Sequence, residues 1–130
     1  MKERTIGQLA REAGVHVETI RYYQRRGLLA EPKRPPGGVR RYNDDAAARL
    51  GFVRRAQELG FSLDEVQALL ALAGTPTCKN ARALAARKLE AVQSRIQGLE
   101  RMRAALSSLI RQCDAGGRRR CAIIESLSRS

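Results

Sequence analysis

The order of apolar and polar residues predicts a chain built mainly from helices. Apolar residues recur at helical spacing after Thr5, and a capping box formed by Thr5 and Gln8 marks where the first helix begins. Gly14 is expected to end this helix, and a second one runs from Val17 to Arg26 before Gly27. Two short helices joined by a tight turn with glycine indicate a helix-turn-helix, although any helical hairpin has the same pattern.

The next segment changes character, because residues 31–38 hold three prolines and two glycines and cannot be helical. Residues 39–42 follow as a short extended stretch, so this part predicts a strand and a small β-wing. Two further helices are expected, from Asp44 to about Leu59 after an Asn43 cap, and from Leu63 to Ala73 after a Ser62–Glu65 capping box.

One long helix is expected from about Asn80 to Gln112, which contains no proline and a single glycine. Such a helix cannot bury a single narrow apolar stripe by itself, so a coiled-coil partner is expected, most simply a second copy of the chain. Packing on the N-terminal part of the same chain is the alternative and would cover the stripe only partly. A short helix is expected at residues 122–127. The stripe consists of Leu89, Val92, Ile96, Leu99, Met102, Leu106 and Leu109.

Charge narrows the choice of partners, since the formal net charge is +12. Residues 21–41 hold seven basic residues and a single acid, Glu31. Nucleic acid is the first candidate partner, an anionic membrane the second, and a solvated basic face needs no partner at all. No apolar run reaches membrane-spanning length and the N-terminus lacks the apolar core of a signal peptide, so a cytoplasmic protein without a membrane partner is expected.

The three cysteines, Cys78, Cys113 and Cys121, are candidate metal ligands. An odd number of thiols argues against a disulfide framework. A helix of roughly 33 residues spans about 50 Å, so Cys78 and Cys113 cannot share a metal within one chain. In an antiparallel pair, Cys78 of one copy would meet Cys113 and Cys121 of the other. Three soft thiolates suit a large soft ion, unless the three cysteines are unrelated. The single histidine, His16, is expected to be a cap or a polar DNA contact.

Several motifs resemble the MerR family of bacterial transcription regulators, and the resemblance covers nearly the whole chain. The matching residues are Thr5-Ile6-Gly7, Ala13-Gly14-Val15, Val17 to Tyr23, Gly27-Leu28-Leu29, Arg40-Arg41-Tyr42 and Leu59 to Glu65. Residues 77–78 and the loop from Cys113 to Cys121 resemble the mercury-responsive members, in which three cysteines shared across a dimer bind Hg(II). Those members usually have eight residues between the last two cysteines, and this chain has seven.

The resemblance implies a mainly α fold: a winged helix-turn-helix DNA-binding domain with connector helices in residues 1–74, a linker and antiparallel coiled-coil dimerisation helix in residues 75–112, and a metal-binding loop with a short helix in residues 113–130. It implies a homodimer on promoter DNA that represses without metal, recruits RNA polymerase, and activates by distorting the DNA when metal binds. The DNA-binding residues it implies, together with His16, are Val17, Glu18, Thr19, Arg21, Tyr22 and Tyr23 in the recognition helix and Arg40, Arg41 and Tyr42 in the wing.

The expected function is therefore regulation of a mercury-resistance operon by Hg(II). The same mechanism responding to Cd(II), Pb(II) or Zn(II) is the first alternative, since relatives with those effectors also keep the first cysteine. A DNA-binding regulator that senses an organic effector or oxidants is a further alternative. An enzyme is not expected, because the sequence has no cofactor motif, no glycine-rich phosphate loop and no evident general base.

Overall fold

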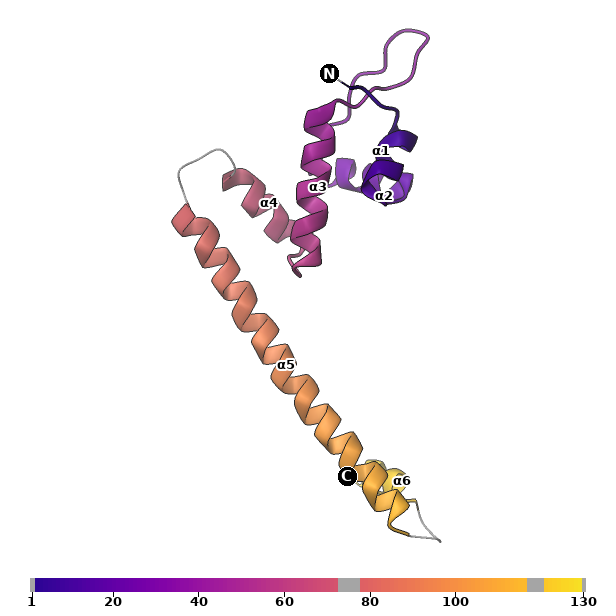
Figure 1. The fold of residues 1–130 in the computed structure, drawn as a ribbon, viewed down its shortest axis with the longest axis vertical. Coiled ribbons are helices and arrows are strands. Elements are labelled where there is room, and N and C mark those ends of the chain that lie inside the picture. Colours follow the sequence, from indigo (N-terminus) through magenta and orange to yellow (C-terminus); the bar gives the residue numbers. More distant parts are fainter. Residues whose placement is uncertain (1, 73–77, 117–120, 130) are drawn as a thin grey trace. The chain divides into compact units, whose positions relative to one another are not determined.

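The structure of the chain is a computed structural model that describes residues 2–72, 78–116 and 121–129 (Figure 1). Parts of the expected linker and of the loop between Cys113 and Cys121 lie outside these residues. The mainly helical fold class is confirmed. The helices are α1 (Ile6–Ala13), α2 (Val17–Arg25), α3 (Asp44–Glu58), α4 (Leu63–Leu72), α5 (Cys78–Asp114) and α6 (Ala122–Ser128).

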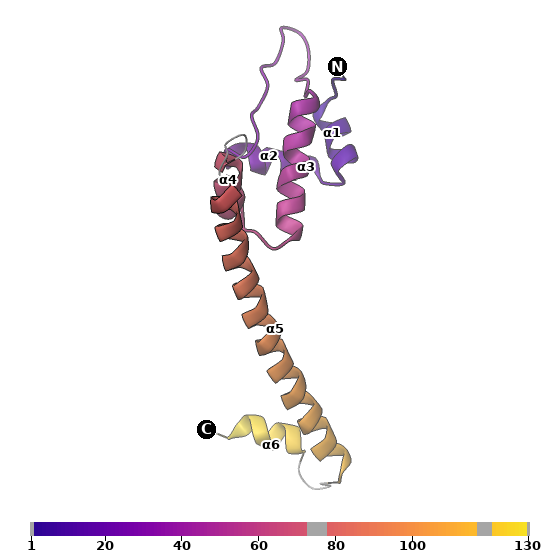
Figure 2. The same cartoon turned by 60° about the vertical axis from the view of Figure 1, so that its left-hand side comes forward.

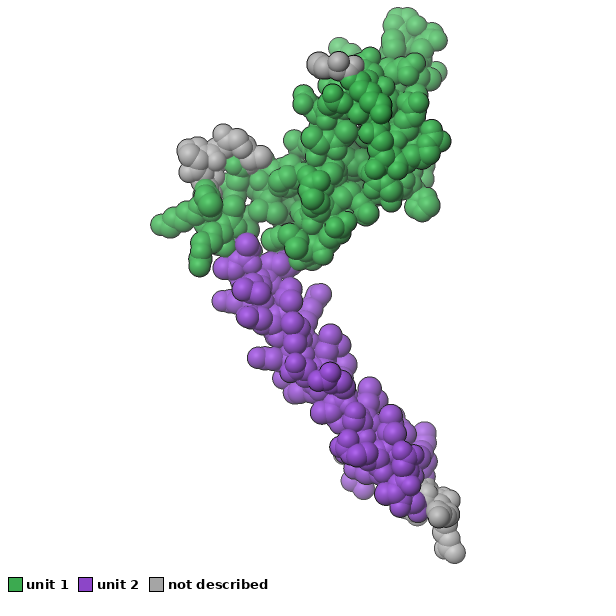
Figure 3. Space-filling model, in the orientation of Figure 1, with its two compact units in different colours: residues 1–84 green, residues 85–130 purple. Residues whose placement is uncertain are grey.

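The chain divides into two compact units, which are coloured separately in Figure 3. Unit 1 comprises Met1–Leu84, and unit 2 comprises Ala85–Ser130. The functional division at residues 74 and 112 that the sequence suggests remains a prediction. No helix in the described part of the chain has the length and apolar character needed to cross a membrane.

The helix starts in unit 1 are set by the side-chain caps that the sequence predicts. The Thr5 hydroxyl accepts a hydrogen bond from the Gln8 N–H, and the Gln8 side chain accepts one from the Thr5 N–H. The Asn43 side chain caps α3. Ser62 and Glu65 form the same reciprocal pair at the start of α4. Each cap satisfies N–H groups that the first turn of a helix leaves unpaired, so the boundaries of these helices are encoded locally.

The turn between α1 and α2 determines where α2 begins. Gly14 takes a left-handed conformation, with φ of 69°, and its N–H reaches back to the carbonyl groups of Ala10 and Arg11. A side chain would be strained at this φ, so glycine is required here. His16 occupies the N-cap position of α2, as one of the two expected roles suggested, but its side chain makes no capping hydrogen bond.

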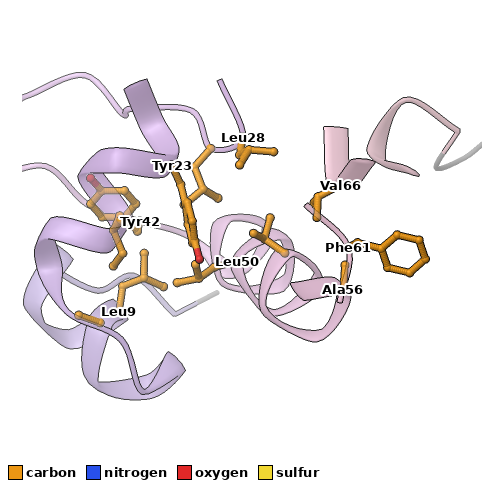
Figure 4. Packing of buried hydrophobic residues seen from close by; sticks show 12 residues of the cluster. Leu9, Tyr23, Leu28, Tyr42, Leu50, Ala56, Phe61 and Val66 are labelled. Atoms are coloured by element: carbon orange, nitrogen blue, oxygen red, sulfur yellow. The ribbon is translucent and has the colours of Figure 1, made fainter. Parts of the chain in front are cut away.

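The core of unit 1 joins α1 to α2 and α3, and α3 to α4. Tyr23 of α2 lies beside Leu50 of α3 at the centre of the cluster (Figure 4). The Tyr23 hydroxyl donates a hydrogen bond to the Gln57 side chain, which satisfies a polar group inside an apolar cluster. The side chains with almost no exposed surface are Leu9, Ile20, Leu28, Tyr42, Leu50, Val53 and Val66.

The expected strand at residues 39–42 is not formed. In the described residues a single antiparallel bridge, between Arg4 and Tyr42, is the only β pairing. Both backbone hydrogen bonds of this bridge are present, at 2.9 and 2.8 Å. Prolines and glycines upstream remove backbone donors and favour turns, so the wing is an extended loop held at its base by one residue pair.

Arg4 reinforces this bridge from inside the fold. The residue is 4% exposed, and its guanidinium forms ion pairs with Glu12 at 2.8 Å and with Asp44 at 3.0 Å. The pKa of Asp44 is lowered, first by the hydrogen bond from Arg4. A single buried cation therefore connects α1, the wing base and the start of α3.

Unit 2 is built from the part of the long helix α5 that follows Leu84 and from the short helix α6. Helix α5 has 37 residues and no buried side chain. Helix α6 turns back beside the end of α5, as both views show (Figures 1 and 2). The two helices line a shared cleft that includes Leu109 and Ala122. Leu109, the last residue of the expected apolar stripe, is thus half-buried, while Ile110 beside it is 53% exposed.

Candidate nucleic-acid interface and thiol site

Helix α2 has one face in the core and one face on the surface. Ile20 and Tyr23 are buried, whereas Glu18, Arg21 and Tyr22 are exposed. Arg21 Nη1 lies 2.7 Å from Glu18 Oε1, which holds the arginine along the exposed face. A short helix anchored by two large side chains can present polar and basic groups to a groove of DNA without changing its own packing.

Tyr22 lies between two arginines at the end of α2. The guanidinium carbons of Arg25 and Arg26 are 5.7 and 5.8 Å from the centre of the Tyr22 ring. Arg26 also donates a hydrogen bond to the Tyr22 hydroxyl at 3.0 Å, and this bond is the largest cause of its raised pKa. Neither arginine belongs to the DNA-binding set that the sequence predicts, although their spacing of three and four residues from Tyr22 places them on its side of the helix.

Arg26 further connects α2 to α4 within unit 1. Its guanidinium is 2.7 Å from Asp64 Oδ1, and its backbone carbonyl accepts a hydrogen bond from the Gln67 side chain at 2.6 Å. The exposed end of α2 is therefore tied to α4 by two contacts that cross 38 and 41 residues of sequence.

The wing presents its arginines on the surface. Arg40 and Arg41 are exposed. Arg40 Nε donates a hydrogen bond to the Pro32 carbonyl at 3.0 Å, and Arg40 Nη2 is 3.7 Å from Glu31. Positive side chains from α2 and from the wing thus occur on the same unit, as a DNA backbone contact requires.

Two of the expected DNA contacts belong instead to the core. Tyr23 is 4% exposed and Tyr42 is 2% exposed, so the side chains pack inside unit 1. The Tyr42 hydroxyl accepts a hydrogen bond from Gln24. Aromatic residues at the edge of a basic segment resemble DNA contacts in sequence. Because both side chains are buried here, they help to form the hydrophobic core. Among the other residues in the predicted set, Val17 and Thr19 are half-buried, and His16 is exposed.

At the end of α5, the structure brings Cys113 and Cys121 together. The two thiols lie close enough to shift each other's pKa, and the pKa of Cys113 is raised, first by the charge of the Cys121 thiolate. The pKa of Cys121 is lowered, first by the backbone N–H group of Ile124 and then by that of Ile123, both in the first turn of α6. The Cys121 side chain nevertheless makes no capping hydrogen bond. The two opposite shifts favour the thiolate at Cys121 over the thiolate at Cys113.

Cys78 is the first residue of α5, and Cys113 lies 35 positions further along the same helix. At 1.5 Å per residue this separation is about 50 Å. All three thiols are free and exposed. In the part of the chain that the structure describes, no three His, Cys, Asp or Glu side chains gather as a metal site. One chain thus supplies two adjoining thiols at one end of α5 and a single thiol at the other.

Comparison with known sequences supports a regulatory family. A sequence model described as "MerR HTH family regulatory protein" matches residues 4–73, and one described as "MerR, DNA binding" matches residues 47–109. The mercuric resistance operon regulatory protein of Pseudomonas fluorescens is 49% identical over 124 residues, which are 95% of this chain and 86% of that protein. Both models describe regulators and not enzymes.

Solved structures agree with this result. The lead(II) complex of the transcription regulator PbrR691 from Ralstonia metallidurans CH34 matches with a TM-score of 0.81 and 35% identity, over 96% of this chain and 99% of that one. The mercury(II) complex of the transcriptional regulator MerR from Bacillus megaterium MB1 matches with a TM-score of 0.75 and 35% identity, over 97% and 100% of the two chains.

Proposed function

Because the chain belongs to the MerR family of helix-turn-helix regulators, we propose that it controls transcription of a mercury-resistance operon in response to Hg(II). Without the metal it represses its promoter. With the metal it activates transcription by distorting the promoter DNA, so that RNA polymerase can open it. The observation that carries the proposal is the arrangement of thiols at the two ends of α5 in a chain 49% identical to a mercuric resistance regulator.

The donor set fits a soft metal ion. Thiolates are the protein ligands that soft ions prefer, and all three cysteines here are free. Cys113 and Cys121 would bind one ion from the end of α5, and the lowered pKa of Cys121 favours the thiolate form that binds metal. The third ligand would be Cys78 of a second copy, because in its own chain Cys78 stands about 50 Å away along the helix.

A second copy is also supported by the surface of α5. Six residues of its apolar stripe, from Leu89 to Leu106, are between 37% and 61% exposed. An antiparallel pair of α5 helices would cover this stripe and would bring the first residue of one helix beside the last turn of the other. The dimer would then hold two equivalent metal sites at its two ends.

The DNA contacts are assigned to the exposed members of the predicted set. Glu18, Arg21 and Tyr22 of α2 would lie in the major groove, and Arg40 and Arg41 of the wing would contact phosphates. The arginines beside Tyr22 extend this surface. Two such surfaces in a dimer would bind two half-sites of one promoter.

Lead(II) is the second candidate effector, because the lead complex of PbrR691 has the higher TM-score of the two metal-bound relatives compared. The higher sequence identity to a mercuric regulator favours mercury. A transcription assay on the promoter beside the chain's own gene would separate the two readings, with each ion titrated alone. Induction at lower Hg(II) than Pb(II) or Cd(II) is expected, and the opposite order would refute the assignment of mercury.

The Cys78→Ser variant tests the thiol site in the same assay. It should keep its affinity for the promoter and lose both induction and the ultraviolet charge-transfer band of the thiolate–metal complex. Ser94→Ala, on the same helix, is the control and should keep both induction and the charge-transfer band. Induction by Hg(II) in the Cys78→Ser variant would refute the three-thiol site.

A further inference from the structure

A basic cleft of about 240 Å³ lies beside α2 in unit 1. Three arginines contribute to its lining: Arg21 from α2, and Arg34 and Arg40 from the wing. One acid, Glu31, lines the same cleft. It is also the only acid in the basic segment from residue 21 to residue 41. A carboxylate in a cleft lined by arginines has the same charge sign as a DNA phosphate, so it can compete with the phosphate for a guanidinium donor.

The two wing arginines are held in place by the loop itself. Arg34 Nε donates a hydrogen bond to the Gly38 carbonyl at 2.9 Å, and Arg40 Nε donates one to the Pro32 carbonyl at 3.0 Å. Each of these bonds uses only the Nε donor, so the terminal nitrogens can serve another acceptor. A guanidinium fixed in this way loses less conformational freedom when it binds a phosphate.

Glu31 makes a weak contact with one of these two arginines, Arg40. Its carboxylate oxygen is 3.7 Å from Arg40 Nη2, and the side chains of Glu31 and Arg40 are 56% and 42% exposed. An ion pair at this distance and exposure contributes little, so it is easily exchanged. A phosphate brings several acceptor oxygens and releases counterions from the DNA, which favours the exchange.

We infer that Glu31 sets the DNA affinity of this protein by pairing with Arg40, in the cleft that Arg21, Arg34 and Arg40 line, until a DNA phosphate displaces it. The inference rests on the proposed function, because it assigns a role at the same DNA-binding surface. Each half-site of a dimer would have to displace or tolerate one carboxylate on binding. Glu31 thereby opposes the sequence-independent attraction that a net charge of +12 creates for any DNA.

The test replaces the carboxylate by an amide of the same shape. Glu31→Gln and Glu58→Gln change the net charge equally, but Glu58 is the last residue of α3 and is exposed. The 15 residues of α3 place it about 21 Å along the helix from the wing base, well beyond the screening length of about 8 Å at physiological salt. Binding is measured by fluorescence anisotropy with a labelled duplex of about 30 mixed-sequence base pairs, at several salt concentrations between about 50 and 200 mM.

Glu31→Gln should tighten binding roughly threefold to tenfold and steepen the salt dependence by up to about one unit of slope per half-site, while Glu58→Gln should stay within about twofold of the wild type. Equal affinities for the wild type and Glu31→Gln, or equal shifts in both variants, would overturn the inference alone. Failure of the wild type to bind the duplex at low salt would overturn the proposed function and the inference with it. Circular dichroism confirms that both variants remain folded.

Discussion

The exposed stripe on α5 predicts that dimer formation depends on single apolar side chains. Leu99 is 61% exposed, and the Leu99→Ala substitution removes three aliphatic carbons from the side chain. Each such carbon contributes about 0.8 kcal/mol when it is fully buried. If the dimer buries the exposed 61%, the three carbons together contribute about 1.5 kcal/mol per copy. Two copies lose about 3 kcal/mol, which corresponds to a rise of roughly 150-fold in the dimer dissociation constant.

Sedimentation equilibrium over a range of protein concentrations measures this constant directly. Gln97→Ala is the matched control, because Gln97 is exposed on the same helix and lies outside the apolar stripe. Circular dichroism should show similar helix content for both variants at concentrations where each is dimeric. Equal dissociation constants for Leu99→Ala and Gln97→Ala would refute burial of the stripe in the dimer.

Three further predictions concern the thiols, the wing base and the DNA surface. A mixed dimer of one copy with Cys78→Ser and one with Cys121→Ser should bind one metal ion in charge-transfer titrations, whereas either variant alone should lack the three-thiol band. Asp44→Asn should lower the unfolding temperature at neutral pH, because Arg4 holds the pKa of Asp44 below its ordinary value. The difference should vanish as pH falls through that lowered pKa, and a pH-independent difference would exclude this cause. Arg41→Gln should reduce the slope of log affinity against log salt concentration by about one unit per half-site, without altering circular dichroism. An unchanged slope would show that Arg41 does not contact a phosphate.

Local signals in the sequence were sufficient to predict the helices of unit 1. Thr5, Asn43 and Ser62 cap their helices as expected, because a cap depends on residues only three positions apart. The wing strand was not predicted correctly. Its pairing depends on Arg4, which is 38 residues from Tyr42 and has no signature of its own in the sequence. A lone arginine before a capping box carries no local signal of burial.

Some features of the candidate site could likewise be predicted from the sequence, and others could not. The sequence separates Cys78 from Cys113 by a helix, and helix α5 agrees with that expectation. The pattern of residues in α2 did not reveal that Tyr23 belongs to the core, since Tyr22 and Tyr23 are neighbours of the same type and only their directions differ. In the sequence, Glu31 stands out only as the single acid of a basic segment. Its position in a cleft with three arginines depends on the folding of the wing loop.

A metal site completed by two copies links metal binding to dimer formation. An ion that binds only the dimer, at a free concentration about 100 times its dissociation constant, stabilises it by about 2.7 kcal/mol per site and about 5.4 kcal/mol for two sites. This exceeds the loss of about 3 kcal/mol worked out for Leu99→Ala. Saturating Hg(II) should therefore restore the dimer of the Leu99→Ala variant in sedimentation equilibrium. It should not restore the dimer of a double variant that also carries Cys78→Ser, because that protein keeps Cys113 and Cys121 but lacks the ligand from the second copy. Equal restoration in both proteins would show that the ion does not require Cys78, and the site would then belong to a single chain.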